Sequence, residues 1–193
     1  MKKPTHDMRQ HILDVAKALM TTKGYTAVGL AEVVAAAGVP KGSFYYYFKS
    51  KEEFGQALLD SYFSEYLSTV DEMLGGQGQA LARLRGYFAF WAEKQCTGLT
   101  DGKCLVVKLG PEVCDLSEDM RLVLERGTDG VIARIAKCIE QGQADGSITS
   151  RMPSLALAET LYQLWLGASL LSKLSKDGAP FETAMSSMEQ MLV

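Results

Sequence analysis

Apolar residues recur at spacings of three and four along most of the chain, which is the period of an α-helix. The first stretch ends at Gly24, and its apolar face is formed by Ile12, Val15, Ala16, Leu19 and Met20. With glycine and proline as boundaries, and with Ser50 and Glu53 as a capping box before the long helix, the same period predicts eight further helices. They cover approximately residues 30–37, 41–47, 51–74, 79–97, 103–110, 117–142, 154–175 and 180–192. Because no alternating pattern of useful length indicates a strand, the sequence predicts an all-α fold.

Residues 30–47 combine two short helices with the intervening turn Gly38-Val39-Pro40, which is the pattern of a helix-turn-helix. In the second helix Phe44 and Phe48 lie four residues apart on one face, and we expect them in a core with Leu30, Val33 and Val39. Residues 45–47 are three consecutive tyrosines that sweep about 200° of a helix. At least two of their hydroxyls must therefore face solvent.

Consecutive tyrosines between lysines suit a surface that meets a polyanion. A phenol hydroxyl can donate to a phosphate oxygen while its ring covers sugar and thymine methyl edges. Lys41, Lys49 and Lys51 add charge that releases counterions from a duplex, and Ser43 is short enough to approach a base edge. A tyrosine-rich packing helix is the alternative interpretation of this segment.

The distribution of charge favours the same end of the chain. Residues 1–51 carry a formal charge of +5, whereas residues 52–193 carry −8, within a total of −3. A basic head on an acidic body suits a polyanionic partner at one end, although chance clustering on a solvated helix remains an alternative. No apolar run reaches the roughly 18–20 residues of a membrane span, and the basic N-terminus leads into a mixed helix, so we expect a cytoplasmic protein.

The cysteines carry the candidate chemistry of the body. All four (96, 104, 114 and 138) lack a C-x-x-C spacing, so we expect free thiols. Cys104 lies near a predicted helix start between Lys103 and Lys108, and both a helix N-terminus and nearby cations favour the reactive thiolate. Cys114 is a candidate resolving thiol. A small buried hydrophobe is the alternative role for any of these cysteines.

Other sites have weaker sequence signals. His6 and His11 have no cysteine nearby, so neither a metal site nor a cofactor is expected. No histidine follows residue 11 to serve as a base, and no nucleophile or phosphate-loop motif is present, so we expect no enzyme. Aromatic residues can line a ligand pocket or simply fill the core, and both readings stay open for Tyr87, Phe88, Phe90, Trp91, Tyr162 and Trp165.

The segment GYTAVGLAEVVAAAGVPKGSFYYYFKSKEEF, residues 24–54, closely resembles the N-terminal unit of TetR-type transcriptional repressors. The resemblance implies a DNA-binding domain over 1–50, a helical sensor and dimerisation domain over 51–193, and a homodimer on double-stranded operator DNA. Gly29 stands where the family usually has a capping Ser or Thr, and Val34 where a smaller Ala is usual. By position, the family's DNA-contacting residues correspond to Lys41, Gly42, Ser43, Tyr45, Tyr46, Tyr47 and Lys51.

The body resembles the NemR-type group of this family, which responds to electrophiles and oxidants through cysteine. The similarity lies in KCLVVKLGPEVCDLSEDMR, GVIARI and LYQLWLGASLLSKLS. It implies that Cys104 is the sensing thiol and that Lys173 falls where the group has a lysine associated with it. The alternative inducer is a reversible apolar ligand in the C-terminal pocket. For the dimer interface, the helices near 117–142 and 154–175 are the candidates, with small residues at 167–169 permitting close approach.

Overall fold

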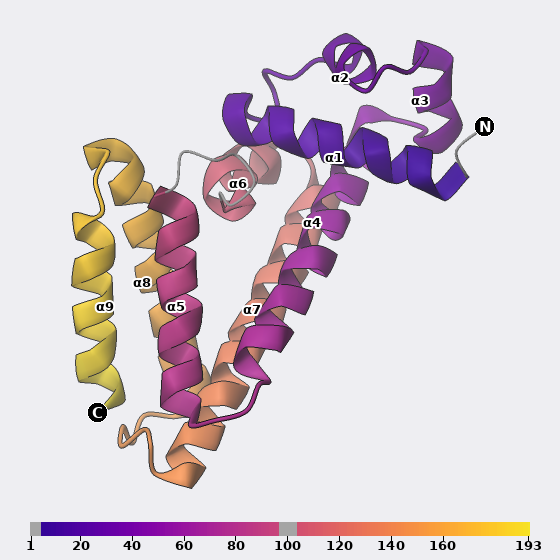
Figure 1. Ribbon diagram of the computed structural model, residues 1–193. Helices are drawn as coiled ribbons and strands as arrows, with labels where there is room; N and C mark the ends of the chain where they lie inside the picture. Colours follow the sequence, from indigo (N-terminus) through magenta and orange to yellow (C-terminus); the bar gives the residue numbers. More distant parts are fainter. Residues whose placement is uncertain (1–4, 97–103) are drawn as a thin grey trace.

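A computed structural model describes residues 5–96 and 104–193 (Figure 1). All regular structure in these ranges is α-helical, which confirms the predicted fold class. The helices are α1 (Thr5–Lys23), α2 (Leu30–Ala36), α3 (Lys41–Tyr47), α4 (Lys51–Leu74), α5 (Ala80–Cys96), α6 (Leu105–Leu116), α7 (Glu118–Asp145), α8 (Ser154–Ser175) and α9 (Ala179–Leu192). Over the described ranges, no helix is both long and apolar enough to cross a bilayer.

The predicted end of α6 at Gly110 was wrong, because the helix continues to Leu116 with Pro111 inside it. A proline within a helix removes one backbone hydrogen bond and normally favours a break. Here Leu109 and Val113, one turn apart, are both fully buried on the same face. Tertiary burial of that face therefore outweighs the local cost of Pro111, whose own ring is exposed.

The first three helices form a head around a small aromatic core. Phe44 and Phe48 are fully buried, as predicted, and both pack against Phe54 at centroid distances of 5.1 and 5.0 Å. Val33 joins this core, whereas Leu30 and Val39 are only partly buried beside it. The turn between α2 and α3 includes Gly38 at φ +66°, and Gly29 caps α2 in an extended conformation without a side-chain hydrogen bond.

Side-chain caps fix the starts of the two longest helices. Ser50 Oγ accepts from the backbone N–H of Glu53 at 3.0 Å, which confirms the predicted cap. The Glu53 carboxylate in turn accepts from the N–H of Lys49 at 3.0 Å. Ser117 caps α7 by accepting from Met120 N–H at 3.3 Å, and its hydroxyl donates to Glu52. The cap of α7 is thereby tied to the first turn of α4.

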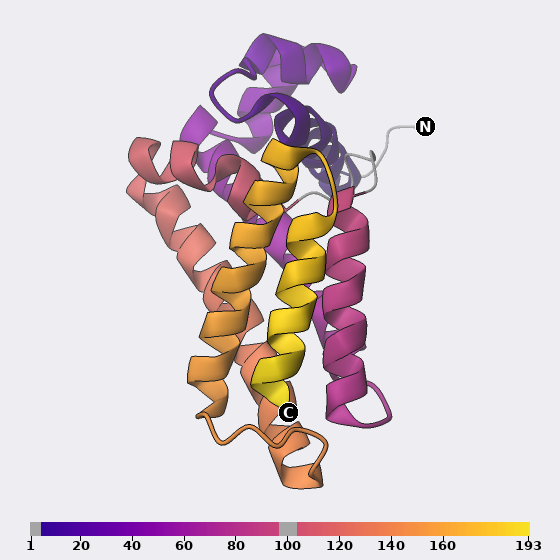
Figure 2. The same ribbon diagram turned by 90° about the vertical axis from the view of Figure 1, so that its left-hand side faces the viewer.

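Burial is divided between two cores. The body core lies among α4, α5, α7, α8 and α9, which run side by side in Figures 1 and 2. The head core combines α1–α3 with the first half of α4, the start of α7, and the buried face of α6. Helix α6 lies directly beneath α1 in Figure 1 and packs against α1, α7 and α8. It therefore connects the head core with α7 and α8 of the body.

Candidate nucleic-acid interface and thiol site

The third helix presents its aromatic hydroxyls to solvent at the outer end of the head. Tyr45 is 52% exposed and Tyr46 74% exposed, whereas Tyr47 is half-buried. The expectation that at least two of the three tyrosines face outward is confirmed. Of the other predicted DNA-contacting residues, Ser43 is half-buried, whereas Lys41, Gly42 and Lys51 are exposed.

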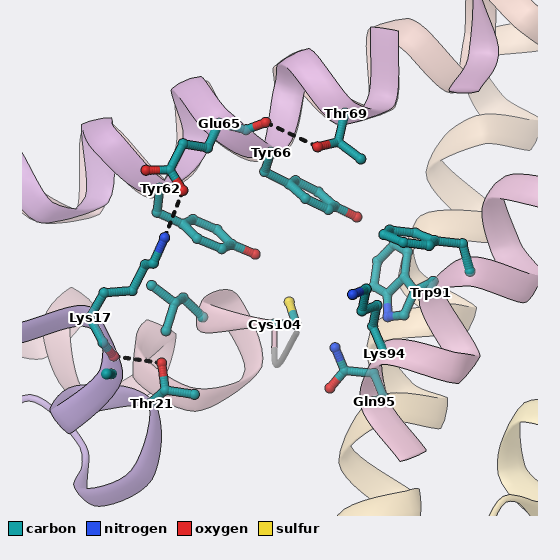
Figure 3. Close-up of a pocket in the computed structure, with 13 residues that line it drawn as sticks. Lys17, Thr21, Tyr62, Glu65, Tyr66, Thr69, Trp91, Lys94, Gln95 and Cys104 are labelled. Atoms are coloured by element: carbon teal, nitrogen blue, oxygen red, sulfur yellow. Dashed lines mark hydrogen bonds and ion pairs between the residues drawn. The ribbon is translucent and has the colours of Figure 1, made fainter. Parts of the chain in front are cut away.

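Cys104 is the N-terminal cap residue of α6 and is 8% exposed. Its sulfur faces a cavity of about 240 Å³ bounded by α1, α4, α5 and the start of α6. Figure 3 shows Tyr62 and Tyr66 of α4 on one side of the sulfur and Trp91 of α5 on the other. The two tyrosine rings are stacked at 5.8 Å, and Tyr66 and Tyr87 share a hydrogen bond of 2.9 Å between their hydroxyls. The thiol therefore lies in an aromatic, partly closed site.

The expectation that Cys104 favours the thiolate at rest was wrong. Burial is the largest influence and raises the pKa of the thiol, because a charged sulfur is poorly solvated there. The backbone amides of Val107 and Val106, the Tyr62 hydroxyl and the positive charge of Lys173 lower this pKa without overcoming burial. Lys108 instead acts on Glu112, and Lys103 lies outside the described residues.

Alkylation of Cys104 by iodoacetamide is expected to keep accelerating above pH 8.5, where an ordinary free cysteine (pKa about 8.5) levels off. A raised pKa leaves the neutral thiol dominant at pH 7, so the thiolate fraction grows about tenfold for each added pH unit until the folded pKa is reached. Peptide-resolved mass spectrometry of the rate against pH measures this. The same cysteine in urea-unfolded protein is the control, and a plateau below pH 8 in the folded chain would contradict the raised pKa.

The other three cysteines lie apart from this site. All four thiols are free, as predicted. Cys114 is exposed near the other end of α6, and ten residues of helix place it about 15 Å from Cys104. A disulfide needs Cα atoms about 4.4–6.8 Å apart, so Cys114 cannot resolve Cys104 within one chain while α6 is folded. Cys138 is buried in the body core, and Cys96 is exposed at the end of α5.

Most of the candidate aromatic residues belong to the body core and do not line the cavity. Tyr87, Phe88 and Trp165 are fully buried, and Tyr162 is nearly so. Phe90 and Trp91 are the candidates that line the cavity. Trp91 is held by a 3.0 Å hydrogen bond from its indole N–H to Ser169, so its ring is fixed beside the thiol site.

Sequence reasoning missed a contact between α6 and the head. The carboxylate of Glu112 accepts from the backbone N–H of Thr26 at 2.9 Å and from its hydroxyl at 2.7 Å. Thr26 lies in the loop between α1 and α2, 86 residues away in the sequence. No local pattern signals such a pair, because its partners meet only when α6 packs beneath α1.

The exposed apolar side chains of the body gather on α8. Four leucines of this helix are exposed, namely Leu155, Leu170, Leu171 and Leu174. A shallow groove beside them is lined by Gly167 and Leu171 of α8 and by Pro180 and Ala184 of α9. By contrast, α7 carries no large exposed hydrophobic residue among those described. The exposed apolar face therefore lies on α8, one of the two helices predicted for the dimer interface, and extends to α9.

A head of three helices, with tyrosines and lysines exposed on or beside its third helix, sits on an all-helical body. A cavity lies where α1 of the head meets α4, α5 and the start of α6. This combination defines a helix-turn-helix regulator. Residues 12–58 match the model for bacterial regulatory proteins of the tetR family, and residues 80–188 match the tetracyclin repressor-like C-terminal domain. The chain belongs to the tetR family of bacterial regulatory proteins.

Individual relatives share nearly the whole chain. The HTH-type transcriptional repressor NemR of Escherichia coli K12 is 40% identical over 192 residues, which cover 99% of this chain and 96% of NemR. The HTH-type transcriptional repressor DhaR of Mycobacterium sp. strain GP1 is 33% identical, over 91% of this chain and 87% of DhaR. The crystal structure of reduced E. coli NemR matches with a TM-score of 0.93 and 39% identity, covering 97% of this chain and 98% of that one. The resemblance to NemR-type repressors is thus confirmed.

Proposed function

We propose that this protein is a transcriptional repressor that binds operator DNA as a homodimer and leaves it when Cys104 is modified by a small electrophile or oxidant. The observation that carries the proposal is the position of Cys104. Its sulfur lines a cavity, and its backbone opens the helix that packs beneath the DNA-binding head. A change in volume or charge at this sulfur therefore occurs beside α1 of the head and at the start of the helix that packs beneath it.

The exposed face of α3 is the proposed DNA surface. Helix α3 would enter a major groove, where Tyr45 and Tyr46 contact phosphates and base edges. Lys41 and Lys51, the latter at the start of α4, would neutralise phosphates. We also place Gly42, Ser43 and Tyr47 in this proposed DNA surface. In the proposed dimer a second copy covers the apolar α8–α9 face, and the two α3 helices lie about 34–36 Å apart, one turn of DNA.

The modifying step is an addition or an oxidation at sulfur. With an α,β-unsaturated carbonyl, a sulfur–carbon bond forms as the C=C π bond breaks, and the carbon next to the carbonyl takes up a proton to replace the one the thiol lost. With hypochlorous acid, the sulfur loses two electrons, chloride leaves and a sulfenic acid forms. Lys173 is close enough for its charge to act on Cys104. Once its ammonium has given a proton to solvent, the neutral amine can bond to the sulfur of the sulfenic acid with release of water.

Reversible binding of an apolar ligand in the same cavity is the second candidate for induction. The aromatic walls formed by Tyr62, Tyr66 and Trp91 favour it, since such walls bury apolar ligands well. Covalent induction requires the sulfur of Cys104 for release from the operator. Induction by a reversible ligand does not require this sulfur, and operator binding should then recover on dilution without a reductant.

Replacement of Lys41 by alanine is expected to weaken operator binding several-fold and to reduce the slope of log K against log salt by about 1. Lys41 is exposed on α3, so the change removes one phosphate contact without disturbing the core. Operator duplexes selected from a random library and fluorescence anisotropy at several salt concentrations measure this. Lys137→Ala on α7 removes the same charge from the body and should leave the slope unchanged. Equal slopes for Lys41→Ala and wild type would remove Lys41 from the DNA surface.

A further inference from the structure

We infer that Glu112 transmits the modification of Cys104 to the DNA-binding head, by holding the α1–α2 loop to the far end of α6. The inference rests on the proposed function and names the contact through which that site is coupled to DNA. Glu112 does not touch the reacting sulfur. It acts through Thr26 and is a positioning residue.

Donors from the α1–α2 loop surround the carboxylate of Glu112. One oxygen of Glu112 accepts both Thr26 hydrogen bonds, at 2.9 and 2.7 Å, and the backbone N–H of Tyr25 also faces the group. Gly24, at φ +96°, lies so close that a Cβ at this position would be 2.5 Å from the other oxygen. Glycine favours this backbone conformation and leaves room for the carboxylate, which a Cβ would displace. The loop amides lower the pKa of Glu112, so it is charged at neutral pH.

The same helix carries the thiol at its other end. Cys104 caps α6 and Glu112 lies eight residues later, about 12 Å along the helix axis. Between them Leu105 and Leu109 are buried in the head core. A helix anchored in this way moves as one body, because packed interiors resist gradual deformation. An adduct that displaces the thiol end of α6 therefore displaces Glu112, and with it the loop that leads into α2.

A second route is available through α4. The cavity beside Cys104 is also lined by Tyr62 and Tyr66 of α4, and α4 begins directly after the head. An adduct can therefore push α4 without involving Glu112. The cavity is also lined by Lys17, Ala18 and Thr21, so an adduct can act on α1 of the head directly. Removing the Glu112 contact separates its route from these others, since it leaves the cavity, α1 and α4 unchanged.

The test compares operator affinity before and after alkylation of Cys104 by N-ethylmaleimide, with and without Glu112→Ala. The wild-type background and the variant both carry Cys96→Ser and Cys114→Ser, since these two exposed thiols would also be alkylated. Coupling between sites typically changes affinity about 5- to 150-fold, and we expect a wild-type ratio near the upper end of that range. In Glu112→Ala, intact-mass and peptide analysis should show an unchanged rate of adduct formation at Cys104, while the affinity ratio falls to about one tenth of the wild-type value. Asp115→Ala is the matched control, because it removes an exposed carboxylate one turn further along α6 and should preserve the ratio.

Two further variants keep the result interpretable. Glu112→Gln retains an oxygen that accepts both Thr26 hydrogen bonds, so it should recover most of the coupling. Thr26→Val removes the hydroxyl donor from an exposed residue and should give an intermediate ratio even if Glu112→Ala folds poorly. A ratio in Glu112→Ala that stays within threefold of wild type overturns the inference, and a larger fall supports it. If Thr26→Val must replace that variant, a ratio equal to that of wild type overturns the inference, and a reproducible fall supports it. Failure of the adduct to weaken operator binding in wild type would instead refute the proposed function.

Discussion

Serine in place of Cys104 is expected to leave operator binding within about threefold of wild type and to abolish its release by N-ethylmaleimide. The hydroxyl is nearly the same size as the thiol, and serine is a good cap for the start of α6, so the resting structure should persist. A serine hydroxyl without an activating base is a very weak nucleophile, whereas cysteine reacts through its thiolate. We expect the N-ethylmaleimide concentration for half-release to rise at least about 100-fold, as measured by anisotropy with an operator duplex.

The remaining cysteines provide the controls. Cys96 and Cys114 are exposed and should also be alkylated, so peptide mapping must accompany each release curve. Their single serine variants, and that of Cys138, should be released as wild type is. If Cys104→Ser is still released by the electrophile, the sulfur is not the sensor. Release by an apolar molecule that reverses on dilution would then favour the ligand-binding alternative.

Alanine at Gly127 is expected to destabilise the protein by about 1–3 kcal/mol, the typical cost of forcing extra volume into a packed core. Gly127 lies on α7 where this helix crosses α4, and a Cβ there would be 2.3 Å from ring atoms of Phe63. Phe63 is only 4% exposed, so its ring has little space to move aside. The two helices must therefore separate, and α4 is the helix that carries the head.

Thermal unfolding at a fixed protein concentration measures this effect. For a chain of this length, about 1–3 kcal/mol lowers Tm by roughly 2–12 °C. Gly86→Ala is the matched control because nothing lies within 4 Å of a Cβ at this exposed helical position. It should raise stability by about 0.5–1 kcal/mol, since alanine favours helix over glycine. An unchanged Tm for Gly127→Ala would show that the α4–α7 crossing is loosely packed.

Much of the architecture was predictable because it depends on short-range pattern. The helical period, the capping Ser50 and the turn around Gly38 placed the helix-turn-helix and the long α4 close to their observed bounds. The same local geometry required outward-facing tyrosines on α3. The end of α6 was not predictable in this way, because Pro111 indicates a break unless one knows that Val113 beyond it is buried.

The thiol site shows the limit of local reasoning. The chain by itself singled out Cys104, through its place at a helix start and its resemblance to cysteine-based regulators. The resemblance had also indicated Lys173, whose charge acts on the sulfur in the structure. Only the tertiary structure showed that burial prevails over the nearby positive charge and that Glu112 joins the same helix to the head. The physical reason is that helix formation depends on neighbours within a few residues. Solvation of a thiol and contacts between distant segments, in contrast, depend on how those helices pack.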